Sequence, residues 1–246
     1  MEFDRLRIKS NARIFYRNNT GAAIAMPLVY IGSSILMVIA SYFFFIIIGS
    51  IGAIIFLGSI AGGPLGALYM LIVAGLFFVS CWVFPMLLAV GMIGWYRNSI
   101  YVKTSVSGIF AFFRKKWLLS SVGMIFLVQI RIILSSLILV IPGIIVAYSY
   151  SQAIFIKTEN ADIPASRAIE LSRLMMEGHK LDLFLLHISF AGWFILTAAT
   201  GGILGIVYVF PYFNAALAFA YEEIKADAAA RGVIDISEII GDMGQY

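Results

Sequence analysis

The chain alternates between long apolar blocks and short charged stretches. The apolar blocks cover residues 21–96, 117–156 and 183–221, and each is longer than the roughly 20 residues that one membrane-spanning helix needs. Proline and glycine interrupt the second block at 141–143, and threonine and glycine interrupt the third at 200–202. Because such residues are typical of tight turns, the pattern predicts helical hairpins that cross a membrane.

Composition favours a membrane protein over a soluble one. Hydrophobic residues make up 62% of the chain and charged residues 12%, whereas about a quarter of the residues in soluble domains are charged. Residues 18–96 form a run of 79 positions without Asp, Glu, Lys or Arg. So few charges cannot cover a water-exposed surface. The predicted fold class is therefore all-α, a polytopic membrane helical bundle.

Basic residues decide how often the first apolar block crosses the membrane. Five Lys or Arg precede the block and five follow it, and the positive-inside rule places both groups in the cytoplasm. Two crossings satisfy this rule and three do not. The glycine-rich middle, residues 49–66, is then an uncharged outer loop or a re-entrant segment. The ten basic residues are Arg5, Arg7, Lys9, Arg13, Arg17, Arg97, Lys103, Arg114, Lys115 and Lys116.

The same rule applied to the whole chain predicts about six transmembrane helices in three hairpins, with both termini cytoplasmic. They form a single membrane domain over residues 1–225, with an N-terminal basic segment at 1–20. The tail, residues 226–246, either docks on the basic loops, binds a soluble partner or stays solvated. The fourth span reaches only about 20 Å of a core near 30 Å thick, so a re-entrant hairpin over 117–156 stays open as an alternative. The predicted spans are 22–48, 68–95, 117–140, 144–156, 183–199 and 203–221.

An amphipathic helix is predicted over residues 164–178, between the second and third apolar blocks. Apolar positions recur there at the helical period, opposite a face of alternating Arg and Glu. Gly178 is suited to end the helix, because glycine adopts the left-handed conformation that closes a last turn. The helix is expected on the cytoplasmic surface, where His179 and Lys180 lie at headgroup level and lead into the fifth span.

Arg131 is the basic residue that the sequence leaves inside an apolar segment. Ionisable residues in such segments are functional candidates, because a charge is expensive to bury in lipid. Arg131 either reaches the outer headgroups or the backbone near the break at 142–143, with Gln129 beside it, or faces a polar cavity and binds an anion or a lipid phosphate. Both interpretations remain open at this point.

The remaining polar residues give little support for catalysis. A metal site would need His179, Asp182 and His187 to converge, but Asp182 and His187 point about 140° apart on one helix. His187 is better explained as a hydrogen-bonded residue of the bundle, although a neutral imidazole can also transfer protons. The sequence contains no phosphate-binding loop, dinucleotide fingerprint or zinc-protease motif. No metal and no cofactor are therefore predicted.

Several short motifs stand in a fixed order in the second half of the chain. Their residues are Pro142, Gly143, Ser172, Arg173, Gly178, His179, Lys180, Ser189, Gly192, Trp193, Pro211, Tyr212, Asn214, Glu222 and Glu223. In this order the motifs resemble the bacterial membrane-protein family called domain of unknown function 975 (DUF975), most densely over residues 139–225. The resemblance implies a multi-pass protein of the bacterial inner membrane with no assigned reaction. His187 departs from the family pattern, in which an acidic residue is usual.

Three function classes follow from these observations. The first is a non-enzymatic membrane protein that binds a lipid, a membrane-active peptide or a partner protein, including a second copy of itself, as an accessory or protective component of the envelope. The second is a transporter or channel for a small solute or anion, with Arg131 in a polar cavity. An intramembrane enzyme using His179, His187, Glu222 or Glu223 is the weakest hypothesis. Nucleic acid is not an expected partner, because the basic residues flank apolar segments and form no aromatic-rich basic face.

Overall fold

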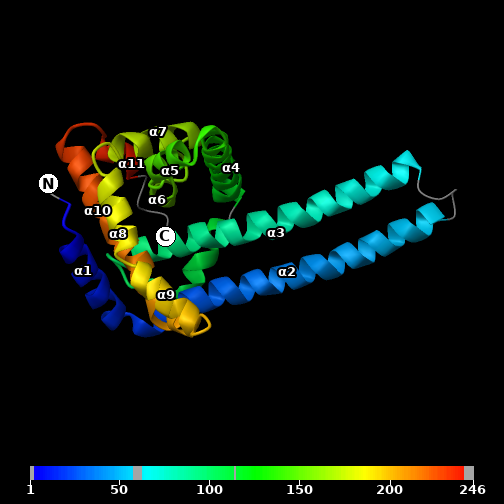
Figure 1. Ribbon diagram of the computed structural model, residues 1–246, viewed down its shortest axis with the longest axis horizontal. Coiled ribbons are helices and arrows are strands. Elements are labelled where there is room, and N and C mark those ends of the chain that lie inside the picture. The colour runs from blue at the N-terminus through cyan, green and yellow to red at the C-terminus, as the bar shows by residue number, and fades with distance from the viewer. Residues whose placement is uncertain (1–2, 58–62, 114, 241–246) are drawn as a thin grey trace. The chain divides into compact units, whose positions relative to one another are not determined.

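A computed structural model describes residues 3–57, 63–113 and 115–240 of the chain, and all regular structure in these residues is helical (Figure 1). The predicted all-α class is therefore confirmed for the part of the chain that is described. The chain divides into two compact units. Unit 1 consists of Met1–Leu28 and Val90–Tyr246, and unit 2 consists of Val29–Ala89. The sequence predicts one membrane domain over residues 1–225, and these bounds stay a prediction.

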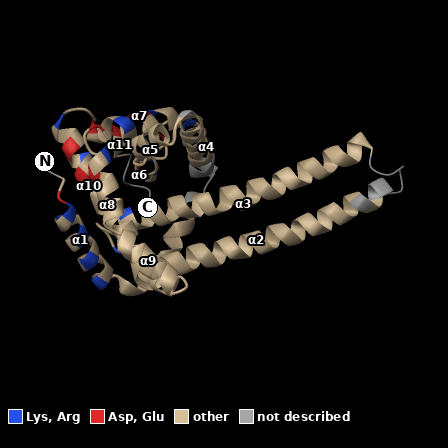
Figure 2. Ribbon diagram, viewed as in Figure 1, with Lys and Arg blue, Asp and Glu red and all other residues tan. Residues whose placement is uncertain are grey.

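Unit 2 contains most of two long helices, α2 (Thr20–Leu57) from residue 29 onward and α3 (Pro64–Asn98) up to residue 89. The Tyr69 hydroxyl donates a 2.5 Å hydrogen bond to the Ile48 carbonyl, and the Ser80 hydroxyl donates one of 3.1 Å to the Ser41 hydroxyl. The helical stretches of this unit appear entirely without charged residues in Figure 2. Apolar side chains cover the exposed surface of the unit, as expected for helices surrounded by lipid.

Both helices are longer than the sequence predicts. The spans were expected at 22–48 and 68–95 with a loop or re-entrant segment at 49–66, but α2 continues to Leu57 and α3 begins at Pro64. Residues 58–62 lie outside the described part of the chain. Apolar residues continue past 48, and an apolar segment satisfies its backbone groups most easily as helix. The 38 residues of α2 rise about 57 Å, so a straight crossing of a core near 30 Å does not use its full length.

Unit 1 is a bundle of shorter helices arranged around α10 (Phe210–Ala230). The apolar face of α1 (Arg5–Asn18) packs on α10 through Ile8, Ala12 and Phe15, which are buried. The remaining elements of this unit are the 3₁₀ helix η1 (Val106–Phe113), α4 (Lys115–Ile138), α5 (Val140–Ser149), α6 (Ala153–Glu159), α7 (Ala165–Met175), α8 (Lys180–Ile188), α9 (Ala191–Ala199), the π-helical turn η2 (Gly205–Val209) and α11 (Ile236–Ile239).

The turn between α4 and α5 lies at Leu139, three residues before the predicted break. Leu139 is extended, with φ −158° and ψ 148°, while Pro142 and Gly143 belong to the first turn of α5. Proline is tolerated there, because first-turn amides have no intrahelical partner to lose. A side chain at Gly143 would overlap Ser136 of α4, so this glycine permits the two helices to pack closely. The other predicted turn, at 200–202, is present, with Gly201 and Gly202 at φ 62° and 89°.

Within the described residues, five helical stretches are long and apolar enough to cross a membrane, so the chain has the character of a multi-pass membrane protein. The fourth, Val140–Glu159, has 20 residues and is longer than the predicted 144–156. The predicted sixth span, 203–221, is not among the five, because η2 interrupts it and the helix that follows, α10, carries Glu222, Glu223, Lys225 and Asp227. The five stretches are Thr20–Gly52, Pro64–Asn98, Ser120–Leu137, Val140–Glu159 and Lys180–Ala199.

The amphipathic helix predicted at 164–178 is observed as α7. Its apolar face packs against protein, since Ala168, Ile169 and Met175 are fully buried and α7 contacts α4, α6 and α10. Its charged face carries the Arg167–Glu170 ion pair at 2.9 Å. Gly178 has φ 91°, the left-handed conformation expected just beyond the helix.

Candidate functional site

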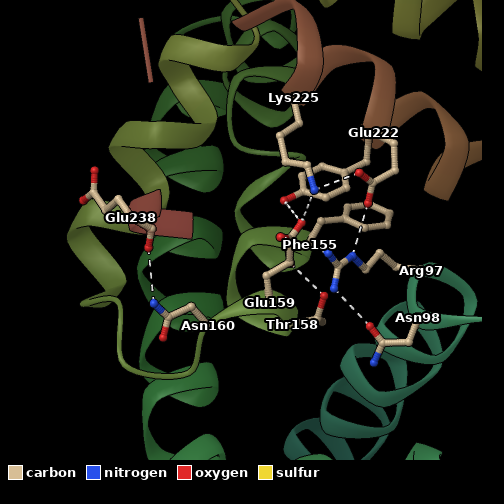
Figure 3. A network of polar contacts seen from close by, with 10 residues as sticks. Arg97, Asn98, Phe155, Thr158, Glu159, Asn160, Glu222, Lys225 and Glu238 are labelled. Atoms are coloured by element: carbon tan, nitrogen blue, oxygen red, sulfur yellow. Dashed lines mark hydrogen bonds and ion pairs between the residues drawn. The ribbon is translucent and has the colours of Figure 1, made fainter. Parts of the chain in front are cut away.

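Four charged side chains of unit 1 form a closed ring, which we call the ion ring: Arg97, Glu159, Lys225 and Glu222 (Figure 3). Arg97 lies in the last turn of α3, Glu159 is the last residue of α6, and Glu222 and Lys225 are one turn apart on α10. Acids and bases alternate around the ring. Three helices that are far apart in sequence are thus joined by charge.

The ring is closed by four short contacts. Arg97 Nη2 lies 2.9 Å from Glu159 Oε2, and Arg97 Nε lies 3.2 Å from Glu222 Oε1. Lys225 Nζ lies 2.7 Å from Glu159 Oε1 and 2.7 Å from Glu222 Oε2. Each carboxylate therefore bridges both cations, and the four formal charges sum to zero.

Glu159 is the most buried member, with 2% of its side chain exposed. Its Oε1 also accepts a 2.5 Å hydrogen bond from the Tyr221 hydroxyl, and the Tyr221 ring stacks on Phe155 at 4.8 Å between centroids. Its Oε2 accepts no regular hydrogen bond from the described residues and has the Arg97 ion pair as its contact. A carboxylate at the C-terminal end of a helix faces the negative end of the helix dipole, so the two cations are needed to hold it there.

Removal of one member of such a buried network is costly. The loss of one partner from a buried ion pair leaves an uncompensated charge and typically destabilises a protein by about 3–5 kcal/mol. The acidic and basic groups of the ring form ion pairs with one another. The ring therefore holds α3, α6 and α10 together, and we call this role a clamp.

A second polar cluster surrounds His179, which precedes α8. His179 Nε2 lies 2.9 Å from Asp227 Oδ2 on α10, and Nδ1 lies 3.4 Å from Asp182 Oδ2. Arg231 Nε lies 2.7 Å from the same Asp227 oxygen and Arg231 Nη1 donates to the Glu177 carbonyl. This cluster ties the turn before α8 to the end of α10.

His187 lies apart from this cluster. Its Nδ1 donates a 2.7 Å hydrogen bond to the Leu183 carbonyl, and its ring packs edge-on against Tyr148 and Phe213 at centroid distances of 5.5 and 5.3 Å. His179, Asp182 and His187 are therefore not brought together. Among the described residues, no group of three His, Cys, Asp or Glu side chains has an arrangement that could hold a metal ion.

Arg131 lies on the surface of α4 and is exposed. Its guanidinium carbon lies 5.6 Å from the centre of the Tyr150 ring, beyond the C-terminal end of α5. Arginine over an aromatic face is a favourable cation–π arrangement. Gln129 is half-buried on the same helix. Of the residues predicted from the sequence as ligand contacts, Arg131 is thus the one that presents a charge outward from an apolar helix.

Several motif residues take part in helix packing. The Ser172 hydroxyl donates to the Ser149 carbonyl at 2.9 Å and accepts from the backbone N–H of Gln152 at 3.1 Å. These two bonds fix α7 against the turn between α5 and α6. Trp193 packs on Tyr208, with 5.2 Å between ring centroids. Glu223 pairs with Arg7 of α1 at 2.5 Å, next to Glu222 of the ion ring.

The other motif residues are local. Pro211 is in the first turn of α10, where proline is favourable, and Tyr212 packs on Phe190 with 5.0 Å between ring centroids. Lys180 is the first residue of α8, Arg173 is exposed on α7, and a side chain at Gly192 would meet open space. Two side chains bond to their own helix: Ser189 donates to the Leu186 carbonyl and Asn214 donates to the Phe210 carbonyl.

Sequence reasoning used Arg97 and Lys225 only as topology signals and did not single out Glu159. The available signal was that each lies where an apolar block meets a charged stretch. That signal indicates that these charged residues lie at a similar depth in the membrane, but it does not indicate which of them are in contact.

A family model described as "protein of unknown function (DUF975)" matches residues 65–228. The chain belongs to this family. The match confirms the resemblance seen in the sequence, and it includes all four members of the ion ring together with Arg131, His179 and His187. The family is described as one of unknown function, so membership assigns neither a reaction nor a site. No curated protein and no solved structure matches the chain.

Proposed function

We propose that this DUF975 protein is a non-enzymatic, multi-pass protein of the bacterial inner membrane that binds a component of that membrane through Arg131. The observation that supports it is the exposed guanidinium of Arg131 on an apolar helix, placed over Tyr150. An exposed arginine within an apolar segment gains most from an anionic partner, and phospholipids supply one. Both termini are proposed to be cytoplasmic, in line with the distribution of basic residues.

The state of the other polar groups supports binding over catalysis. The carboxylates and bases of the ion ring are engaged with one another, and His187 bonds to a backbone carbonyl. General acid–base catalysis needs a titratable group within hydrogen-bond reach of a substrate. In the described residues the clusters around Glu159 and His179 serve instead to join helices.

The transport alternative would be favoured by a polar cavity that reaches Arg131. The structure places Arg131 on the outside of α4 beside Tyr150, which supports contact with lipid or with a partner in the membrane. The arrangement therefore favours the binding hypothesis.

Reconstitution in proteoliposomes tests the proposal. We expect chloride and phosphate flux with the wild-type protein to equal that of protein-free liposomes. We also expect Arg131→Ala to lower the retention of anionic lipid during purification about fivefold, the effect of one basic contact near a membrane, while Arg131→Lys retains most of it. Circular dichroism controls for folding. Anion flux that Arg131→Ala abolishes would instead establish a transporter, and equal lipid retention by all three proteins would remove the role of Arg131.

A further inference from the structure

Two adjoining pockets open between the junction of α1 with α2 and the loop that follows α3. Their volumes are about 300 and 510 Å³. Both belong to unit 1 and share the lining residues Asn18, Asn19, Ser99 and Lys103. The smaller pocket also contains Thr20 and Trp95. Because the pockets share these four lining residues, we treat them as one polar site.

The first turn of α2 gives this site hydrogen-bond donors. Thr20, Gly21 and Ala22 line the smaller pocket, and the first amides of a helix have no intrahelical partner. The helix dipole adds partial positive charge at the same end. At the end of the preceding helix, the Asn19 and Thr20 side chains donate to the Phe15 and Tyr16 carbonyls at 3.1 and 2.9 Å, so these two acceptors are satisfied within the chain.

Lys103 adds a full positive charge. It is exposed and makes no hydrogen bond or ion pair with the residues that the structure describes. No Asp or Glu is among the described residues that line either pocket. Arg97, on the same stretch of chain, is already occupied by the ion ring. Amides, hydroxyl groups and one free ammonium are the groups that recognise a phosphate oxyanion.

The surroundings of the site point to a lipid as the source of that phosphate. Arg17 and Arg97 end the chargeless run 18–96 on its two sides, so the site lies where apolar helices meet charged chain. Tyr101 and Val102, on the wall of the larger pocket, are 63% and 68% exposed. Exposed aromatic and apolar residues beside basic ones are typical of segments at the headgroup boundary.

We infer that this pocket binds the phosphate of an anionic phospholipid headgroup, with Lys103 and the first turn of α2 on the phosphate and Tyr101 and Val102 beside the glycerol and acyl region. The inference rests on the proposed membrane location but does not require Arg131, which belongs to another helix. A negative result for this pocket would therefore not disprove binding at Arg131, and a negative result at Arg131 would not disprove binding in this pocket.

Native mass spectrometry of the protein released from nanodiscs tests the site. With equal phosphatidylglycerol and phosphatidylcholine, we expect the wild-type protein to retain phosphatidylglycerol, and Lys103→Ala to weaken the affinity for one bound phosphatidylglycerol molecule about fivefold while lipid bound elsewhere is retained. Lys103→Arg is expected to restore most of the binding. Arg173→Ala is the matched control, because it removes one exposed positive charge from α7. Equal losses in Lys103→Ala and Arg173→Ala would overturn the inference, since nonspecific surface charge would then explain both.

A second measurement separates a lipid headgroup from free phosphate. We expect phosphatidylglycerol to raise the unfolding temperature of the detergent-solubilised protein in a manner that depends on Lys103, and inorganic phosphate at millimolar concentration not to do so. Val102→Ser is expected to weaken the lipid effect. If inorganic phosphate alone gives the full Lys103-dependent shift and Val102→Ser changes nothing, the lipid assignment is overturned.

Discussion

The two units of this protein differ in their charge and in what covers their apolar side chains. Unit 2 has no charged residue, and large side chains such as Phe44, Leu71 and Phe78 are exposed along its helices. Unit 1 holds every charged residue of the chain; it buries apolar side chains around α10 and exposes others, such as Leu137 on α4 and Ile195 on α9. Figure 2 shows the contrast along the ribbon, with charges on α1, α7 and α10 and none along most of α2 and α3.

This difference shows which solvent stabilises each unit. Few side-chain contacts join the helices of unit 2, so its stability depends on lipid and on the hydrogen bonds within each helix. Unit 1 depends on contacts between its own residues, and several of these are ionic. Mutations should therefore act by different rules in the two units.

The largest expected effect is in the ion ring. Glu159→Ala leaves Arg97 and Lys225 without their shared carboxylate, so we expect a loss of about 3–5 kcal/mol in the free energy of unfolding. Glu170→Ala breaks an exposed pair and is expected to cost less than about 1 kcal/mol. Unfolding by sodium dodecyl sulfate in mixed micelles measures both. Similar losses for the two variants would show that the ring is not a clamp.

The next effect distinguishes exposure to lipid from exposure to water. Leu76 in unit 2 is 58% exposed and Leu6 on α1 is 81% exposed. Arginine at the centre of a spanning helix costs about 2.5–3.5 kcal/mol on insertion scales, so Leu76→Arg should lower the membrane-inserted fraction strongly. Leu6→Arg should leave it unchanged, because α1 already carries basic residues. A glycosylation-based insertion assay reports the fraction, and equal tolerance at both positions would contradict the contrast between the units.

The smallest effect concerns the tail. Arg167 Nε donates a 2.7 Å hydrogen bond to Glu238, and this contact lowers the pKa of Glu238. A lowered folded-state pKa means that the pair stabilises docking of α11 fully above the unfolded pKa, about 4.3, and that this stabilisation is lost as the pH falls through the lower folded value. Hydrogen exchange of residues 236–239, corrected for the intrinsic rate, should show that loss.

Variants of the two acidic partners of Arg167 provide the control for the tail experiment. Glu238→Gln should reduce the acid-dependent loss of protection to the part that comes from Asp235, whose carboxylate caps α11 and whose pKa is also lowered, by its hydrogen bond from Ser237. Glu170→Gln, on the other side of Arg167, should retain the whole of that loss. Protection at 236–239 that falls equally with acid in both variants would show that some other group governs docking of the tail.

The sequence predicted those parts of the fold that depend on local pattern. The apolar blocks, the turn at Gly201–Gly202 and the amphipathic α7 all follow from residues close together in the chain. The turn before α5 was placed at Pro142, but the chain turns at Leu139. A proline can break a helix or begin one, and close packing of Gly143 on Ser136 favours the second outcome here.

The candidate site was harder to predict, because its members meet over long separations. Arg97 and Glu222 are 125 residues apart, and Glu159 and Lys225 are 66 apart. The sequence marks Arg97 and Lys225 only as charges at the ends of apolar blocks, and it does not single out Glu159. Which carboxylate meets which cation depends on how α3, α6 and α10 pack, and a single sequence carries no direct signal for that packing.

The long separations within the ion ring also set an order of events during synthesis. Lys225 is made 66 residues after Glu159, which at about 5–20 residues per second is a delay of roughly 3 to 13 seconds. During that interval Glu159 and Arg97 have emerged without α10. A ribosome that stalls before Lys225 would therefore leave a nascent chain in which Arg97 and Glu159 can pair with each other but are not yet joined to α10.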